Sequence, residues 1–243
     1  MVASMTRVPT RIHGKGFVEI YGDVDAAVTI LFCCRENFQL DDVFFHRLVE
    51  HFTSRGARLV QHISRADLNF RRTDPRWLLG HSRWFRRCIK GVILLGTPRG
   101  WPHLLPGIRA RARAISTRSR SLGELITSLD RTGIVLLGRS SGARLASLVA
   151  DDPRVGKVVC LGYPFQNPME GPNPLRYKHL PKVETPMLMI QGDADPYGGK
   201  GVEELYEFAA NTTLHFAETD HSFDLSDAQW LEITATMDAF MGI

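Results

Sequence analysis

The chain has 243 residues, 44% of them hydrophobic, which is enough to bury the core of one large α/β domain or of two small ones. It contains no apolar run near the roughly 18 residues that a membrane span requires, so the sequence predicts no membrane-spanning helix. No stretch rich in Pro, Ser and Gly divides the chain, so we expect a single domain over residues 1–243. The first 16 residues lack the apolar segment of a secretory signal and predict a flexible lead-in to the first strand. The four cysteines show no metal-ligand spacing, and together these features favour a cytoplasmic protein.

The net charge of +4 is concentrated in one region. The segment Arg71–Arg120 carries 13 Lys and Arg and a single acid, Asp74, whereas the rest of the chain carries 17 basic and 25 acidic residues. The same segment contains Trp77, Trp84 and Trp101, and a mixture of arginine and tryptophan is typical of surfaces that stack on bases. We favour a solvated arginine face over this alternative and expect no nucleic-acid partner.

Taken in chain order, the apolar patterns predict an α/β fold with a doubly wound, mostly parallel sheet of about seven strands and helices on both faces. The predicted strands cover residues 17–21, 27–34, 58–63, 134–137, 157–161, 187–191 and 213–217. The predicted helices cover about 42–54, 108–129, 143–150, 202–210 and 227–240. In the first of these helices, helical spacing predicts that Val43, Phe44, Leu48 and Phe52 are buried, and Gly56 ends it.

Two segments interrupt this alternation of strands and helices. Residues 66–130 are too many for a simple connection and predict a basic helical insertion, with a short amphipathic helix at 77–85, a brief apolar run at 92–95 and then the long helix. Residues 162–185 are rich in proline and cannot form a regular helix, so they predict a short cap segment.

The stretch 134–150, which reads IVLLGRSSGARLASLVA, places the pattern G-x-S-x-G between an apolar strand and a segment of good helix formers. This order is typical of a nucleophile elbow, a turn so tight that it requires the flanking glycines Gly138 and Gly142 and presents the Ser140 hydroxyl. The backbone N–H of Ser141 would then lie at a helix start and stabilise an oxyanion. The alternative is a glycine-rich loop before a buried helix.

A serine hydroxyl is a poor nucleophile at neutral pH and needs an imidazole base that a carboxylate orients. In proteins with such an elbow, the acid and then the histidine follow the serine in the chain. Asp195 and His221 occur in this order, each after one of the last two predicted strands, and complete a triad with Ser140. Asp193 stays open as the alternative acid. We prefer Asp195 because it lies further past the strand end and a proline follows it. His215 lies within a strand, and other histidines precede the elbow.

Four segments carry a family resemblance: Gly138–Gly142, Gly162-Tyr163-Pro164, the sequence QGDADPYG at 191–198, and DHSF at 220–223. Through them the chain resembles the α/β-hydrolase fold family over nearly its whole length. More narrowly, it resembles the dienelactone-hydrolase-like branch, in a group related to a subunit of a histone acetyltransferase complex. The resemblance implies a hydrolase that requires no cofactor and no metal.

The chain departs from the family pattern in the loop after the second predicted strand. Many esterases carry His-Gly there, whereas this chain has CRENFQ at 34–39, which is similar to a His-Glu-Asn-x-Gly version with Arg35 for the histidine and Gln39 for the glycine. The resemblance implies that the backbone N–H of Asn37 is the second oxyanion donor. Dienelactone enzymes of the family use a cysteine nucleophile, so a serine at this position favours ordinary esters or thioesters.

These features together predict a serine hydrolase of the carboxylesterase or thioesterase kind. Its substrate would be a small carboxylic ester or thioester, cleaved through an acyl-enzyme. The alternative is a catalytically silent interaction module that keeps the fold and a vestigial triad. The altered loop at 34–39 and the resemblance to a histone acetyltransferase complex subunit motivate that alternative.

Overall fold

The computed structural model describes residues 5–10, 16–33, 43–64 and 108–243. Several predictions fall outside these residues: the oxyanion loop with Asn37, the helix at 77–85, the apolar run at 92–95 and most of the basic insertion.

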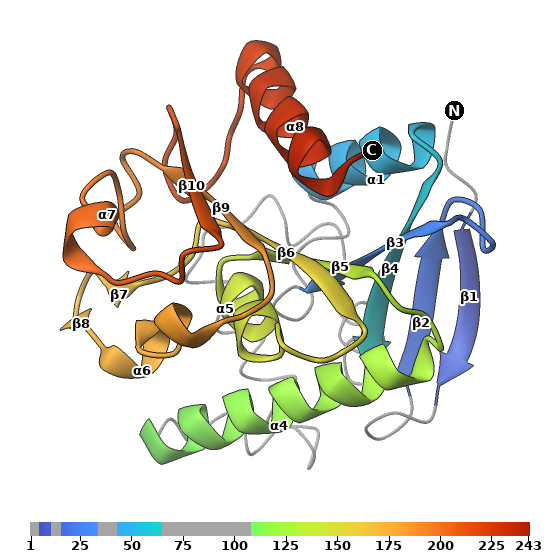
Figure 1. The fold of residues 1–243 in the computed structure, drawn as a ribbon, viewed down its shortest axis with the longest axis horizontal. Coiled ribbons are helices and arrows are strands. Elements are labelled where there is room, and N and C mark those ends of the chain that lie inside the picture. Colours follow the sequence, from blue (N-terminus) through green and yellow to red (C-terminus); the bar gives the residue numbers. More distant parts are fainter. Residues whose placement is uncertain (1–4, 11–15, 34–42, 65–107) are drawn as a thin grey trace, which may run out of the picture.

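Within the described residues the chain forms an eight-stranded sheet in the order β1-β2-β4-β3-β5-β6-β9-β10 (Figure 1). Its strands are β1 (Met5–Thr10), β2 (Gly16–Tyr21), β3 (Val28–Cys33), β4 (Ala57–Ser64), β5 (Ile134–Arg139), β6 (Val155–Leu161), β9 (Met187–Gly192) and β10 (Thr212–Ala217). The strands from β4 to β10 pair in parallel, and β2 pairs antiparallel with both β1 and β4. The predicted doubly wound, mostly parallel sheet is therefore confirmed, as is each of the seven predicted strands.

Strand β1 corrects the prediction of a flexible lead-in at residues 1–16. It pairs with β2 over its whole length, from Met5 opposite Tyr21 to Thr10 opposite Gly16. Its sequence, MTRVPT, has no continuous apolar run and contains a proline. An edge strand has a neighbour on one side only, so it tolerates proline and needs no strong apolar signal.

Helices cover both faces of the sheet (Figure 1). The described part of the chain forms α1 (Val43–Ser54), α4 (Ile108–Ser128), α5 (Ser141–Leu148), α6 (Pro174–Tyr177), α7 (Val202–Leu205) and α8 (Asp227–Met241), together with the 3-10 turn η3 (Leu180–Lys182) and a small hairpin of β7 (Gln166–Asn167) and β8 (Gly171–Pro172). Helices α1 and α8 pack on one face, and α4 and α5 on the other. Alternate residues of β5 enter the two cores, Leu136 on the α5 side and Leu137 on the α1 side, because successive side chains of a strand point to opposite faces.

Two details of the predicted helices are wrong. Val43 is 72% exposed, because it is the first residue of α1 and the buried side begins with the next residue, Phe44. Helix α7 ends at Leu205, well before the predicted end at 210, since Tyr206 adopts an extended conformation. Its ring stacks on that of Phe165 with 4.8 Å between the centroids, so tertiary packing overrides local helix propensity here.

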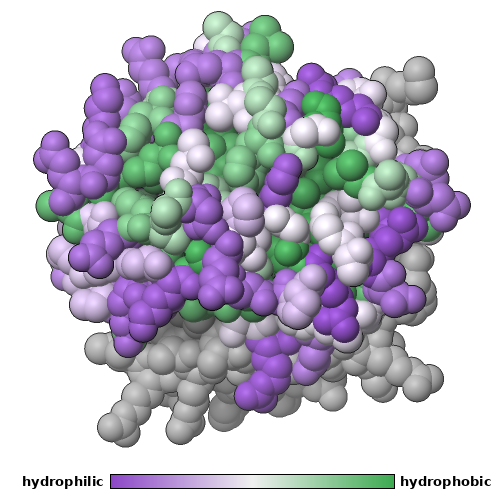
Figure 2. All heavy atoms as spheres, viewed as in Figure 1, coloured by the Kyte–Doolittle hydropathy of each residue, from purple (hydrophilic) through white to green (hydrophobic). Residues whose placement is uncertain are grey.

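On the face shown in Figure 2, patches of hydrophobic side chains lie among hydrophilic ones. Large apolar side chains are exposed at several described positions, among them Met169 at the β7–β8 turn and Leu205 at the end of α7. Among the helices that the structure describes, none combines the length and the apolar character needed to cross a bilayer.

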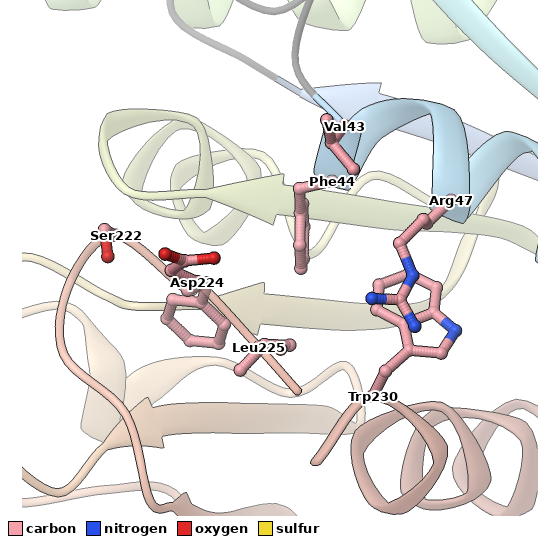
Figure 3. Close-up of a pocket in the computed structure, with 8 residues that line it drawn as sticks. Val43, Phe44, Arg47, Ser222, Asp224, Leu225 and Trp230 are labelled. Carbon is pink, nitrogen blue, oxygen red and sulfur yellow. The ribbon is translucent and has the colours of Figure 1, made fainter. Parts of the chain in front are cut away.

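A cavity of about 220 Å³ lies where α1 and α8 meet the loop that follows β10 (Figure 3). Phe44 and Trp230 contribute aromatic walls, and their rings meet edge to face at 5.6 Å. The Arg47 guanidinium lies 4.4 Å from the centre of the Trp230 ring and donates to Asp227. Ser222 and its neighbours form the other wall, so the cavity borders the segment that carries His221.

Candidate active site

The turn from β5 to α5 has the geometry of a nucleophile elbow. Ser140 adopts φ 53° and ψ −120°, a combination that residues with a Cβ rarely occupy and that sharp functional turns retain. Its backbone N–H still donates to Leu161 O on β6, and helix α5 begins at the next residue. A Cβ on Gly138 would lie 2.5 Å from Ala143 Cα, so only glycine lets strand and helix approach this closely.

Gly138→Ala is therefore expected to destabilise the protein by about 1–3 kcal/mol or more, the usual cost of overpacking a rigid backbone contact. The matched control is Gly123→Ala in α4, where an added Cβ meets no atom of the described residues within 4 Å apart from its chain neighbours and the backbone of its own helix. In a helix interior the same substitution stabilises by about 0.5–1 kcal/mol. Urea unfolding of both variants measures the two free energies of unfolding, and equal changes would contradict this view of the elbow.

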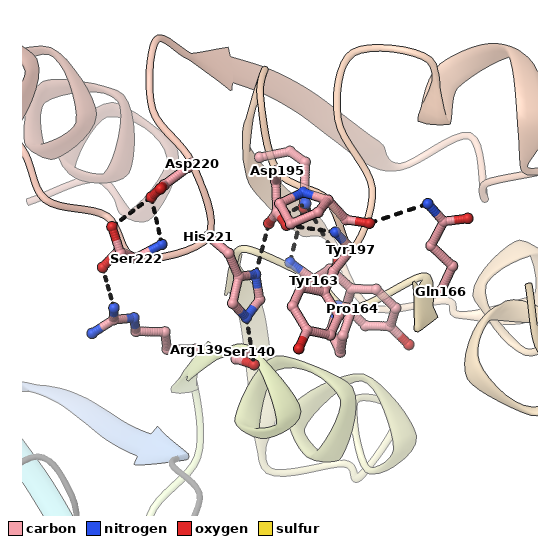
Figure 4. A network of polar contacts seen from close by, with 12 residues as sticks. Arg139, Ser140, Tyr163, Pro164, Gln166, Asp195, Tyr197, Asp220, His221 and Ser222 are labelled. Atoms are coloured by element: carbon pink, nitrogen blue, oxygen red, sulfur yellow. Dashed lines mark hydrogen bonds and ion pairs between the residues drawn. The ribbon is translucent and has the colours of Figure 1, made fainter. Parts of the chain in front are cut away.

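Ser140, His221 and Asp195 form one continuous chain of hydrogen bonds (Figure 4). Ser140 Oγ lies 2.9 Å from His221 Nε2, and His221 Nδ1 lies 2.8 Å from Asp195 Oδ2. The Asp195 side chain is 0% exposed, whereas that of His221 is 24% exposed and open to a ligand. Asp193, the alternative acid, instead lines a surface hollow together with Asp220. The structure thus brings together the three residues of the predicted triad.

The buried carboxylate of Asp195 accepts three hydrogen bonds. Besides His221, Gln191 Nε2 donates to Oδ2 at 2.9 Å, and the backbone N–H of Tyr197 donates to Oδ1 at 2.8 Å. The Tyr197 ring also lies against the imidazole of His221, with 4.3 Å between the centroids. These donors satisfy a buried acceptor and restrict its rotation. Sequence reasoning missed both partners, although each stands in the segment 191–198 that carries the resemblance.

Gly162, which follows β6, leaves room for the contact between Asp195 and His221. It has a φ of +58°, and an added Cβ would lie 2.9 Å from the Phe223 ring and 3.5 Å from both Asp195 Oδ2 and His221 Nδ1. A side chain here would be strained by the backbone conformation and would crowd the hydrogen bond between Asp195 and His221. This explains the glycine of the Gly162-Tyr163-Pro164 segment.

A second serine–histidine pair joins α5 to the residue before η3 and has a different character. Ser147 Oγ is 2.8 Å from His179 Nε2, but Ser147 sits within α5, is only 3% exposed, and also donates to the Arg144 carbonyl. Burial, and secondarily the charge of Arg144, lower the pKa of His179 from 6.5 to about 4. No carboxylate hydrogen bond to His179 occurs among the described residues, so this pair lacks both an orienting acid and access.

The half-buried His179, with its lowered pKa, predicts a pH effect on stability. Between pH 4 and 6.5 His179 is protonated in the unfolded chain but neutral in the folded protein. The free energy of unfolding should therefore fall as pH is lowered through this window. His179→Gln keeps a polar partner for Ser147 and does not titrate, and it should lose this part of the slope. Unfolding curves of both proteins between these pH values test it, and parallel stability profiles would contradict the assignment.

The remaining predicted site residues concern the oxyanion. Ser141 is the first residue of α5, and backbone N–H groups in the first turn of a helix have no intrahelical partner. Its own hydroxyl is buried without a hydrogen-bond partner among the described residues. Asn37 lies outside them. Arg139, beside Ser140, donates to the Ser222 carbonyl and lies 4.9 Å from the centre of the Phe44 ring, linking the elbow to the loop of His221.

A strained serine between a parallel strand and a helix, facing a histidine and a buried aspartate from later strands, defines the class of α/β hydrolases. The comparisons with known proteins agree. The model of the family described as "alpha/beta hydrolase domain" matches residues 108–241, and the chain belongs to this family. No curated protein matches the sequence.

Solved structures with the same fold share little sequence with this chain. A thioesterase domain from the curacin biosynthetic pathway is 10% identical, with a TM-score of 0.62 over 96% of this chain and 99% of that one. An esterase from Exiguobacterium antarcticum is 14% identical, with a TM-score of 0.62 over 98% and 100%. A dienelactone hydrolase from Anabaena variabilis is 14% identical, with a TM-score of 0.59 over 100% and 99%. At these identities the likeness establishes the fold alone.

Proposed function

We propose that the chain is a serine hydrolase that cleaves a small carboxylic ester or thioester through an acyl-enzyme. The observation that carries the proposal is the unbroken hydrogen-bond chain from Ser140 Oγ through His221 to the buried Asp195. Esterases and a thioesterase among the structures of the same fold support the choice of ester or thioester.

In this mechanism Ser140 Oγ attacks the carbonyl carbon while His221 Nε2 takes its proton, and Asp195 holds the imidazole with Nδ1–H directed away from the serine. The negative charge that develops on the carbonyl oxygen is met by the backbone N–H of Ser141 at the start of α5 and, in our proposal, by that of Asn37. His221 then passes the proton to the departing alcohol or thiol. A water molecule, activated by His221 in the same way, attacks the acyl-enzyme and releases the acid and Ser140.

We also propose that the chain is a single catalytic domain in which residues 162–185 form the cap. These residues include the β7–β8 hairpin, α6 and η3, and they lie between β6 and β9. Arg144 of α5 donates to the Leu175 carbonyl of α6 at 2.8 Å, which joins the cap to the helix that follows the nucleophile. In our proposal this segment limits the size of the acyl or alcohol group that the site accepts.

The test uses the parent protein. A fluorophosphonate probe is expected to label it covalently, and p-nitrophenyl esters and acyl thioesters of increasing chain length are expected to be turned over, the shorter ones faster. A folded protein that shows neither label nor turnover would overturn the proposal and favour an interaction module instead.

A further inference from the structure

Gln191 lies behind the proposed triad, at the end of β9, and is 1% exposed. We propose that Gln191 is a positioning residue of the triad: it fixes the Asp195 carboxylate and moderates the negative charge that this carboxylate presents to His221. The proposal rests on the proposed function and adds a residue that takes no part in the reaction itself.

The orientation of the Gln191 amide follows from its partners. The backbone N–H of Tyr163 lies 2.8 Å from Oε1, and because an N–H only donates, the atom it faces must be the amide oxygen. The amide nitrogen then faces Asp195 Oδ2 at 2.9 Å, with a longer contact of 3.3 Å to the Tyr163 carbonyl. Both ends of the amide are therefore bound to the chain after β6, and Gln191 holds a donor at a fixed point beside the acid.

Asp195 Oδ2 is the oxygen that also accepts from His221 Nδ1, at 2.8 Å. A donor on the same oxygen stabilises the carboxylate and weakens its attraction for a proton on the imidazole. Without Gln191, Oδ2 would interact with His221 alone and hold the imidazolium more strongly. The carboxylate would then be held only by the Tyr197 N–H at Oδ1 and by His221, the group that it has to orient.

Besides Asp195 at Nδ1, other charged or titratable groups surround His221, and none of them contacts the Gln191 amide. They are Asp220 immediately before His221 in the chain, the Tyr197 ring beside it, and Arg139, which donates to the next carbonyl, that of Ser222. A shift in the titration of His221 on substitution of Gln191 would therefore report the contact between Gln191 and Asp195.

The experiment compares Gln191→Leu and Gln191→Met with the parent. Gln191→Leu removes the donor and is expected to lower kcat by about 10- to 100-fold, the worth of a hydrogen bond to a charged group, with KM within about twofold. The acid limb of the kcat profile should move to higher pH. Gln191→Met keeps the length of the side chain but has no N–H to donate, so the limb should move in the same direction. If the leucine variant does not fold, the methionine variant supplies the measurement.

The matched control is Gln61→Leu. Gln61 is also a strand glutamine, 4% exposed, but it lies on β4, separated from β9 by β3, β5 and β6 in the sheet. The Gln61→Leu variant should have a changed melting temperature, and the acid limb of its kcat profile should stay at the parental pH. A Gln191 variant that loses stability in the same way while its pH limb and kcat stay at parental values would overturn the proposal.

A second readout separates this proposal from the proposed function. The pKa of His221 is measured in each protein by NMR of 13C-labelled histidine, with His221→Asn to assign the signal. If the parent is active and the His221 pKa is unchanged in both Gln191 variants, the positioning role fails and the hydrolase stands. If the pKa rises in the variants but the parent neither reacts with the probe nor turns over any ester, the positioning role stands and the proposed function fails.

Discussion

Ser140→Ala is expected to lower kcat by at least about 10,000-fold and to abolish labelling by a fluorophosphonate, because in serine hydrolases loss of the nucleophile removes nearly all of the triad's contribution. Alanine keeps the Cβ and the strained backbone at φ 53°, so the fold should be retained. Peptide mass spectrometry of the labelled parent is expected to place the adduct on Ser140.

Ser147→Ala is the matched control for this experiment. Ser147 lies on α5, the helix that follows Ser140, and contacts a histidine at a similar distance, yet no orienting acid is found for this pair among the described residues. The Ser147→Ala variant should be less stable, because Ser147 is a buried partner of His179. It should still be labelled by the fluorophosphonate, and its kcat should stay within about threefold of the parent. A label that survives in Ser140→Ala, or that disappears from a folded Ser147→Ala, would contradict the assigned nucleophile.

Asp195→Asn is expected to lower kcat by about 10,000-fold with little change in KM, as the same exchange does in the serine protease triad. The neutral amide cannot serve as an acceptor for every donor around it, and it no longer stabilises the imidazolium that forms at His221. The side chain is fully buried, so solvent cannot replace the lost acceptor.

The control here is Asp193→Asn, which changes the acid that the sequence left open. Asp193 lines a surface hollow, and the carboxylate that contacts His221 Nδ1 is that of Asp195, so the Asp193→Asn variant should keep kcat within about threefold of the parent. Steady-state kinetics of both variants on one ester decide between the two acids. A larger loss in Asp193→Asn than in Asp195→Asn would reverse the assignment.

Local patterns in the sequence were sufficient for much of the fold. Strands such as β3, β5 and β9 are continuous apolar runs, because parallel strands in this sheet are covered on both faces, and α1 shows its buried side by helical spacing. Strand β1 and the early end of α7 were not predictable in this way. The first depends on pairing with a neighbouring strand, and the second on the stacking of Tyr206 against Phe165.

By itself the sequence determined the elbow and the chain order of serine, aspartate and histidine, because these depend on short-range backbone geometry and on which residues follow strands. Only the tertiary structure decided which aspartate faces His221 and which of two serine–histidine contacts is accessible. It alone revealed that Gln191 and Gly162 shape the environment of the acid. The physical reason is that these contacts join loops from separate strands, and their distances are set by how the sheet brings those strand ends together.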